Sequence, residues 1–408
     1  MMRPLGQQEL AGLIREVSDR GAVRELLVRL LRWPSPKTDL MEAEPQVLEF
    51  ISRGITAELA RVGVEEHRID GMGNLIARKG KAANGRSFLY VTYAMNHPPE
   101  RMPDPFSGEI VDGAAHGVEG ECAWGRGACE QKGPLAAVLG ALALIAAVEK
   151  KMSEEIPGDL LFVTSTAGET GRHDSFRWMI EKEGVRAEAA VLASSSKNEV
   201  CLGNKGRVGI RVKVKGRAAH ISTPWAGVDA IRGAREIMSR LDGFVPEGEH
   251  PALGRVTLTV QGIKSFPFDS STIPSECELV VDRRLLPGDE PEKAFRELEA
   301  LVGTLDGYEL IVQRGTFQYP GEVSQDSQAV AALAEGVTAM TGREPTFVYS
   351  HPVLDQGYLN RMGIETIKFG PGDVRFAHTD VDLVQVDEVV EAAQILAYAA
   401  LRHLLGGE

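Results

Sequence analysis

The sequence has little cysteine: four residues in 408, with no pair at the CxxC spacing of many metal and redox sites. They are Cys122, Cys129, Cys201 and Cys277. A chain of this length can bury enough apolar surface to fold without disulfide staples. The scarcity excludes a disulfide-rich module and favours reduced structural thiols in a cytoplasmic protein.

The sequence also lacks a long basic run and a long hydrophobic run. Its net charge is −13 and its pI is about 5.3, so its surface repels nucleic acid and anionic lipid. The longest apolar run, residues 134–148, is too short to cross a bilayer. Residues 1–17 lack the apolar core of a signal peptide. We therefore expect neither a nucleic-acid partner nor a membrane partner.

What is present is a pattern of α/β segments long enough for two domains. Apolar strand-like runs alternate with helical stretches and predict a mostly parallel central sheet. These runs cover 87–93, 159–165 and 189–193. From about residue 207 the segments follow the β-α-β-β-α-β order of a ferredoxin-like α+β domain. The sequence predicts a discontinuous α/β domain, residues 1–206 and 319–408, with residues 207–318 inserted.

Three polar, glycine-containing segments could carry chemistry: residues 125–133, 166–171 and 369–379. Taken singly, each has a simple structural interpretation. Glu130 fits the first turn of a helix, where the helix dipole favours acids. Glu169 fits a loop carboxylate, and His378 fits a surface histidine. The first segment lacks the GxxxxGK(S/T) spacing of a phosphate-binding loop.

Order and spacing favour a more specific interpretation. The run GRGACEQKG at 125–133 resembles the GRG-x-x-D-x-KG segment of the di-zinc aminoacylase/carboxypeptidase family. That family includes acetylornithine deacetylase, succinyl-diaminopimelate desuccinylase, carboxypeptidase G and aminoacylase. The resemblance extends over nearly the whole chain. Its further landmarks, in family order, are WPSP at 33–36, GNLIA at 73–77, NKGR at 204–207, KGRAAH at 215–220, VDRR at 281–284, FGPG at 369–372 and AHT at 377–379.

The resemblance implies a metal site. In the family, two zinc ions share a bridging Asp, each ion has ligands of its own, and a Glu acts as general base. The bridging residue aligns with Glu130, a metal Glu with Glu169 and a metal His with His378. These three could hold one zinc ion, or another divalent metal. Such ions lower the pKa of a bound water and polarise the scissile carbonyl.

The other half of the family's site is replaced. Tyr93 and Met95 stand where the family has a metal His and the Asp that orients it. Gly168 stands at the general base, and Ser194 at the acid of the second ion. The sequence therefore predicts at most one tightly bound ion and weak or absent hydrolysis. A shifted chain could supply substitute groups, and the candidates are His97, His173 and Asp174.

The inserted domain keeps more of the family's residues. The resemblance makes it a dimerisation domain, in which His220 reaches the partner subunit's site and stabilises the oxyanion. Arg283 or Arg284 matches an arginine that holds a substrate carboxylate, whereas Ser271 replaces an Asn. The simpler interpretations are a capped loop residue for His220 and strand-end ion pairs for the arginines.

Two functions remain open at this stage. The first is a hydrolase that cleaves N-acyl amino acids or peptides beside a free carboxylate, using one metal ion. The second is a non-catalytic binding or sensor protein for an amino-acid-like or peptide ligand. In both cases the resemblance implies a homodimer and a ligand that bears a carboxylate.

Overall fold

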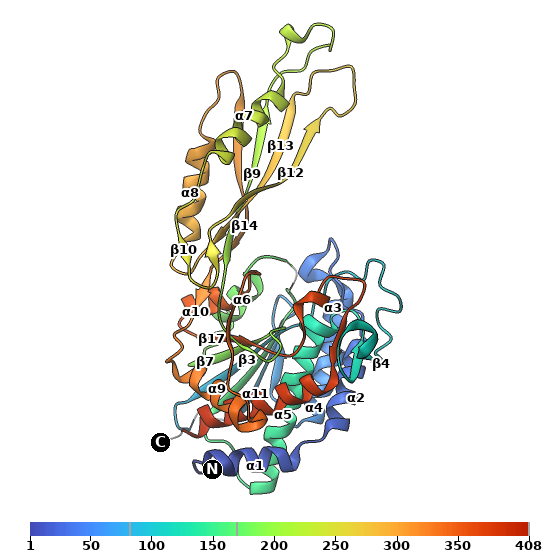
Figure 1. The fold of residues 1–408 in the computed structure, drawn as a ribbon, viewed down its shortest axis with the longest axis vertical. Coiled ribbons are helices and arrows are strands. Elements are labelled where there is room, and N and C mark those ends of the chain that lie inside the picture. Colours follow the sequence, from blue (N-terminus) through green and yellow to red (C-terminus); the bar gives the residue numbers. More distant parts are fainter. Residues whose placement is uncertain (81–82, 169, 407–408) are drawn as a thin grey trace. The chain divides into compact units, whose positions relative to one another are not determined.

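The computed structural model describes residues 1–80, 83–168 and 170–406 (Figure 1). By their internal contacts the residues form two compact units. The larger unit contains Met1–Gly203, Val323–Val348 and Leu359–Glu408, and the smaller unit contains Asn204–Glu322 and Tyr349–Tyr358.

Three segments of this division differ from the sequence-based boundaries: residues 204–206, 319–322 and 349–358 all group with the smaller unit. Tyr349–Tyr358 groups with the smaller unit, although the sequence placed it in the larger domain. The Tyr349 hydroxyl donates a hydrogen bond to Glu322 at 2.7 Å, and its ring centroid lies 4.9 Å from that of His250. These are contacts between residues distant in sequence, which local patterns do not reveal.

The central sheet of the larger unit is parallel in its middle and antiparallel at its margins. Strand β3 (Ser87–Tyr93) runs parallel to β6 (Asp159–Ser165) and β7 (Ala189–Ala193), and β17 (Glu365–Phe369) runs parallel to β7. The antiparallel strands are β1 (His67–Ile69), β2 (Leu75–Gly80) and β8 (Val200–Asn204), and β16 (Phe347–Ser350) also pairs with β8. The predicted α/β class is confirmed, but the sheet is mixed rather than mostly parallel, because the strands at its margins run antiparallel.

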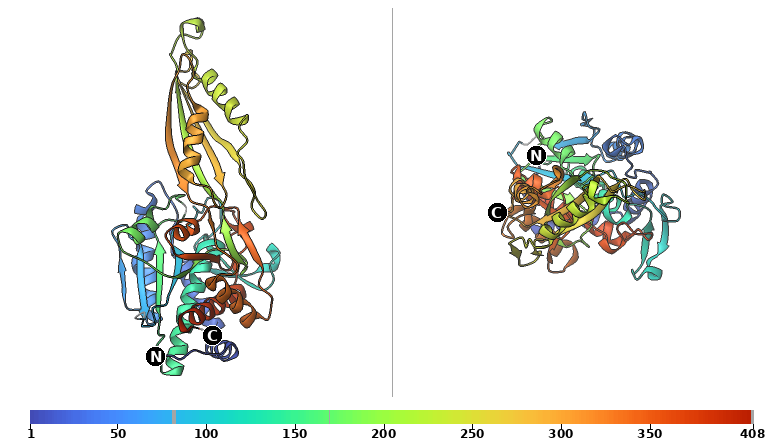
Figure 2. Two further views of the ribbon diagram at one scale, coloured as in Figure 1. Left: turned by 90° about the vertical axis from the view of Figure 1, so that its left-hand side faces the viewer. Right: turned by 90° about the horizontal axis from the view of Figure 1, so that it is seen from above.

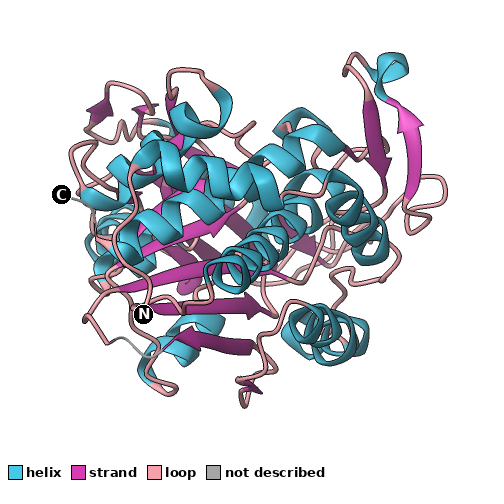
Figure 3. Cartoon of the chain, turned by 90° about the horizontal axis from the view of Figure 1, so that it is seen from below, coloured by secondary structure: helices cyan, strands magenta, loops and turns pink. Residues whose placement is uncertain are grey.

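Helices α5 (Gly133–Met152) and α11 (Val386–Leu405) pack against each other and against β3 (Figure 1). Figure 3 shows helices packed against strands of the sheet. The segment Ala128–Met152 is long and apolar enough to cross a membrane, but 83% of its most apolar window is buried inside the protein. It is apolar on all sides because it is covered on all sides. The other helices of this unit are α1 (Gln7–Val17), α2 (Arg20–Leu31), α3 (Pro45–Glu49), α4 (Thr56–Arg61), α6 (Asp174–Glu181) and α9 (Gln328–Thr341).

Short elements complete the larger unit. A small sheet has the order β18 (Leu383–Gln385), β5 (Glu121–Trp124) and β4 (Glu109–Asp112). The π- and 3₁₀-helical turns are η1 (Met41–Ala43), η2 (Phe50–Ile55), η3 (Gly113–His116), η4 (Ala128–Lys132) and η6 (Val374–Phe376). Helix α10 (Gln356–Arg361) follows β16 in the chain.

The smaller unit is an antiparallel four-stranded sheet with two helices on one face (Figures 1 and 2). In sheet order the strands are β12 (Leu258–Phe266), β13 (Glu276–Leu285), β9 (Gly206–Lys215) and β14 (Glu309–Gln318), and the helices are α7 (Ala230–Asp242) and α8 (Pro291–Val302). Alternate residues of β9, from Val208 to Val214, are buried under the helices. The predicted ferredoxin-like α+β order is confirmed. Turn η5 (Pro224–Ala226) lies in a connection, and the short strands β10 (Glu249–His250) and β11 (Gly254–Arg255) pair with each other. The short strand β15 (Gly321–Glu322) belongs to the central sheet.

Candidate functional site

The candidate site lies at the carboxyl edge of the parallel strands, where α/β sheets bind ligands. Two hydrogen bonds hold the loops together at this edge. The Ala94 N–H, just after β3, donates to Ser165 at the end of β6 at 3.0 Å. The Ser194 N–H, just after β7, donates to Phe369 at the end of β17 at 3.3 Å. Segments far apart in the sequence are thereby gathered into one place.

Glu130 and His378 form the polar centre of this edge. The His378 Nε2 lies 3.0 Å from the Glu130 Oε2. His378 has a left-handed backbone with φ of 59°, which is uncommon for a residue other than glycine and is characteristic of constrained functional positions. The structure therefore brings two of the three predicted metal ligands together. The third, Glu169, lies outside the described residues.

A buried carboxylate that the sequence analysis missed anchors the turn carrying Glu130. Asp382 accepts hydrogen bonds from the N–H groups of Gly127 at 2.7 Å and Cys129 at 2.9 Å, and Arg126 lies 3.4 Å away. Burial raises the pKa of Asp382 to about 6, although the two backbone hydrogen bonds oppose that rise. Only its position after the AHT landmark could have drawn attention to it.

Close backbone packing fixes the turn carrying His378 against the turn carrying Glu130. Gly372 has φ of 105°, and a Cβ added there would lie 2.1 Å from the Cys129 carbonyl oxygen. No other residue type fits this approach, so the glycine of the FGPG landmark has a structural cause.

Other landmarks also support the loops without facing a substrate. Lys132 is fully buried, donates to the Trp33 carbonyl oxygen and lies over the Phe50 ring, with Nζ 5.4 Å from the ring centroid. Burial lowers the pKa of Lys132 to about 7. The buried Asn74 accepts a hydrogen bond from the Thr166 N–H at 2.9 Å and so anchors the loop after β6. The WPSP, GN and KG landmarks therefore have a structural role, because their residues hold the loops of the candidate site in place.

The replaced half of the site is buried and closely packed. The Tyr93 ring meets the Phe176 ring edge to face, with centroids 5.8 Å apart. Met95 is fully buried, and Ser194 is only 3% exposed. A Cβ added at Gly168 would lie 2.8 Å from the Met95 carbonyl oxygen. The backbone therefore leaves no room for a base side chain at residue 168.

Of the three candidate substitutes, one lies beside the Glu130–His378 pair. The His97 ring stacks on the His378 ring at 4.1 Å between centroids, and its Nε2 lies 3.3 Å from the Glu100 carboxylate. Asp174 begins α6 and pairs with Arg172 at 3.4 Å, and His173 is buried just before it.

The side chains at this edge supply part of the ligand set that zinc requires. Among the residues described, no group of three or more His, Cys, Asp or Glu side chains is arranged to hold a metal. Glu130 and His378 have the ligand chemistry of a zinc site that Glu169 could complete. Tyr93 and Ser194 do not offer the ligands that a second ion needs.

The smaller unit brings His220 and Ser271 together. The Ile221 N–H donates to the Ser271 carbonyl oxygen at 2.9 Å, and His220 forms a β-bridge with Thr272. The His220 Nδ1 lies 2.7 Å from the Ser222 hydroxyl oxygen, and the ring is exposed. This hydrogen bond fixes the orientation of an exposed imidazole.

The two candidate arginines differ in their surroundings. Arg283 is buried under the helices and its Nη1 pairs with Glu297 at 2.7 Å. Arg284 points to the other face of the sheet, where its Nε lies 2.8 Å from Asp282. Arg207 shares that carboxylate, also at 2.8 Å, so one positive charge is left over. Arg284 is therefore better placed than Arg283 to hold a further carboxylate.

Comparisons with known proteins agree with the resemblance. Residues 202–308 match the family model described as a peptidase dimerisation domain. The chain is 27% identical to acetylornithine deacetylase of Myxococcus xanthus, over 82% of this chain and 84% of that protein. It is 28% identical to a probable carboxypeptidase of Neosartorya fischeri, over 68% of this chain and 63% of that protein.

Solved structures share the fold. An M20 family metallo-carboxypeptidase from Sulfolobus solfataricus superposes with a TM-score of 0.77 at 17% identity, covering 93% of this chain and 98% of that one. Human carnosine dipeptidase 1 superposes with a TM-score of 0.70 at 16% identity, covering 99% and 100%.

Proposed function

Because this chain belongs to the M20 aminoacylase/carboxypeptidase family, we propose that it binds an N-acyl amino acid or peptide beside its free carboxylate and hydrolyses it poorly or not at all. The observation that carries this proposal is the close approach of Met95 to Gly168. A Cβ at this position would lie 2.8 Å from the Met95 carbonyl oxygen, which supports the interpretation that no catalytic carboxylate stands there. General-base catalysis contributes about 10²–10⁴-fold to such reactions.

The retained residues support binding more than turnover. Glu130 and His378, with Glu169, would hold one zinc ion, which when bound would polarise the scissile carbonyl and acidify a water molecule. Arg284 would hold the substrate carboxylate, because a guanidinium binds it through two parallel hydrogen bonds. Losing groups that act only in the transition state lowers turnover and leaves affinity largely intact.

The test is a panel of N-acetyl amino acids and dipeptides with zinc, cobalt or manganese. We expect turnover at least about 10²-fold below that of a relative with a complete site, together with thermal stabilisation by the bound ligand. Robust turnover that disappears in Glu130→Gln would refute the proposal. Gly168→Glu is not expected to restore activity, because its Cβ meets the Met95 carbonyl oxygen.

A non-catalytic binding or sensor protein is the second candidate, and the exposed, oriented His220 and the available Arg284 favour it. Ligand-induced stabilisation with no detectable turnover under any metal supports this function. Turnover that is slow but abolished by His378→Ala supports the first.

We also propose a homodimer formed through the smaller unit, as its match to a dimerisation domain suggests. Strand β12 is an edge of the sheet and carries exposed apolar side chains, Ile263 at 54% and Phe266 at 66%. Light scattering is expected to give a dimer that Ile263→Asp weakens, and a monomer at micromolar concentration would contradict the proposal. The four cysteines are buried and form no disulfide within the described residues, which supports the cytoplasm as the location.

A further inference from the structure

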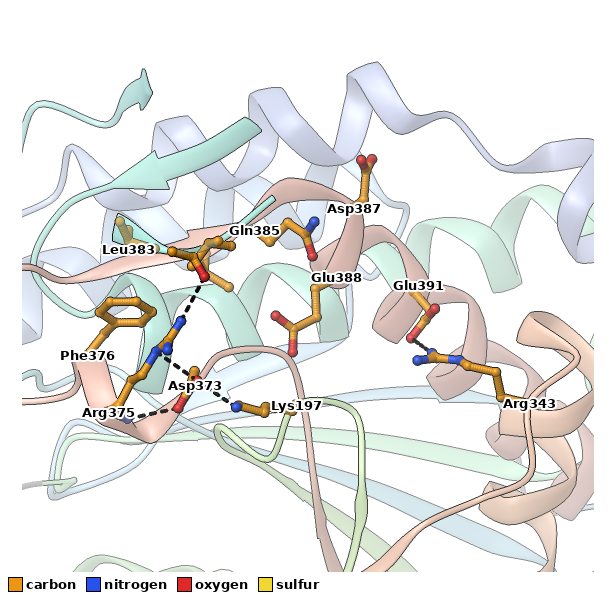
Figure 4. A pocket seen from close by; sticks show the side chains of 13 residues that line it. Lys197, Arg343, Asp373, Arg375, Phe376, Leu383, Gln385, Asp387, Glu388 and Glu391 are labelled. Carbon is orange, nitrogen blue, oxygen red and sulfur yellow. Dashed lines mark hydrogen bonds and ion pairs between the residues drawn. The ribbon is translucent and has the colours of Figure 1, made fainter. Parts of the chain in front are cut away.

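The larger unit contains a cavity of about 350 Å³ that lies apart from the Glu130–His378 pair. It lies between η6, the start of α11 and the loop after β7 (Figure 4). Its volume is within the range of cavities that hold small molecules. Glu130 and His378 are not part of its lining. Its charged lining residues are Lys197, Arg343, Asp373, Arg375, Asp387, Glu388 and Glu391.

One wall of the cavity has a surplus of positive charge. The Lys197 Nζ lies 2.6 Å from the Asp373 carboxylate, and the Arg375 Nε lies 3.0 Å from the same group. Arg375 also donates to the Gly117 carbonyl oxygen at 3.2 Å. Two cations share the Asp373 carboxylate, so this wall carries one positive charge more than its ion pairs neutralise. The Lys197 charge also acts on the lining residue Glu388, whose pKa it lowers, without forming an ion pair with it.

Glu388, in the first turn of α11, carries the opposite charge. Its Oε1 accepts the Gly372 N–H at 3.1 Å, but it forms no ion pair within the part of the chain that the structure describes. Burial raises the pKa of Glu388 to about 7, with the Gly372 hydrogen bond and Lys197 partly opposing the rise. Such a carboxylate gains from a cationic ligand, because its own surroundings solvate it poorly.

The remaining acidic residues of the cavity are already paired. Glu391 pairs with Arg343, and Asp387 pairs with Arg20 at 2.5 Å. Figure 4 shows the Asp387 side chain directed away from Glu388. The available charges are therefore the negative Glu388 and the positive Lys197–Arg375 pair.

The backbone around the cavity is also unusual. Lys197 and Asn198 are consecutive residues with left-handed φ, 55° and 56°. Asn198 is 6% exposed and donates from Nδ2 to the Glu388 carbonyl oxygen at 2.9 Å, whereas its Oδ1 has no hydrogen-bond partner among the described residues. Strained positions and orphaned buried polar atoms persist where the structure over-determines them, commonly at binding sites.

We propose that this cavity is a second binding site, for a small zwitterion such as a free amino acid. The ammonium group of the ligand pairs with Glu388, and its carboxylate meets the Lys197–Arg375 wall. Neither Glu388 nor the Lys197–Arg375 wall can bind both charged groups of the ligand. The site therefore selects molecules that carry an ammonium group and a carboxylate. The proposal is independent of the proposed hydrolase function, because the two sites share no lining residue named for chemistry.

The test is calorimetric titration of the metal-free protein with the twenty free amino acids. The best-bound amino acid is then compared with its amide, which lacks the carboxylate, and its N-acetyl form, which lacks the ammonium group. We expect both derivatives to bind at least about tenfold more weakly, the loss of one charge-assisted contact. Glu388→Gln should weaken the zwitterion similarly, and Asp387→Asn, one residue away on the same helix turn, should not.

Three results would overturn the proposal: no amino acid binds, the N-acetyl form binds as well as the zwitterion, or a folded Glu388→Gln variant binds unchanged. Glu130→Gln and His378→Ala separate the two sites. Binding that survives in both variants lies in the cavity, and binding lost in them lies in the proposed hydrolase site and refutes the second site. Thermal melting of each variant verifies that it is folded.

Discussion

The two halves of the candidate metal site fold at the same sheet edge but differ in how their side chains are satisfied. In the retained half, Glu130 and His378 lie 3.0 Å apart on turns braced by Asp382 and Gly372. In the replaced half, a tyrosine packs on Phe176 and the Met95 carbonyl fills the space beside Gly168.

The difference is one of packing: the half that holds Tyr93, Met95 and Gly168 is closely packed. A mere loss of ligands would leave unpaired polar groups or space, and both are costly in a protein interior. Here buried side chains, those of Tyr93 and Met95 among them, and backbone occupy those positions. The retained half keeps two polar groups that are only partly buried and that favour a cation between them.

The largest expected effect tests whether only one half binds metal. Elemental analysis should give at most one zinc per chain. His378→Ala should weaken zinc binding by about 10²-fold or more, because an imidazole ligand is lost, and Tyr93→Phe should not change it. Two equivalents of zinc per chain, or a zinc affinity that is the same in His378→Ala as in the parent, would show that the two halves do not differ in metal binding.

The next effect tests the packing at Gly168. Gly168→Ala should lower the free energy of unfolding by about 1–3 kcal/mol, because the new Cβ lies 2.8 Å from the Met95 carbonyl oxygen. Gly12→Ala, in α1 with open space around it, is the control and should raise stability by about 0.5–1 kcal/mol. Urea unfolding measures both. If Gly168→Ala left the free energy of unfolding unchanged, the replaced half would have space for an added methyl group.

A third effect uses Glu388, a half-buried carboxylate that forms no ion pair among the described residues. Its folded-state pKa of about 7 is above its ordinary value of 4.5, so the folded protein binds more protons between these pH values. Stability from this group therefore falls as pH rises from 4.5 to 7, by on the order of 1–3 kcal/mol. Glu388→Gln should remove this decline, and the variant should gain stability relative to the parent between pH 5 and pH 8 in thermal melts.

The smallest expected effect concerns Asp174 and His97, two of the candidate substitute ligands. Asp174→Asn should change stability and zinc affinity little, by less than about 0.5 kcal/mol, because its pair with Arg172 is exposed. His97→Ala tests the stacked ring on His378, and a loss of zinc affinity there but not in Asp174→Asn would assign His97 to the retained half. A large loss in Asp174→Asn would instead show that the site extends to α6.

Much of the fold could be predicted from the sequence. Period-two alternation marked β9, continuous apolar runs marked β3 and β6, and both follow from which faces of a strand are buried. The pairing of Glu130 with His378, which are 248 residues apart in the chain, was predicted only through the family resemblance.

Tertiary structure decided the rest. That Gly168 faces a carbonyl oxygen, that Arg283 turns under α8 while Arg284 faces the opposite side, and that Asp382 caps the Glu130 turn are all long-range contacts. Local propensity carries no information about them, because each depends on the position of a residue distant in sequence. The sequence by itself determined which residue types are available for chemistry, and the packing of distant segments determined which of them can meet.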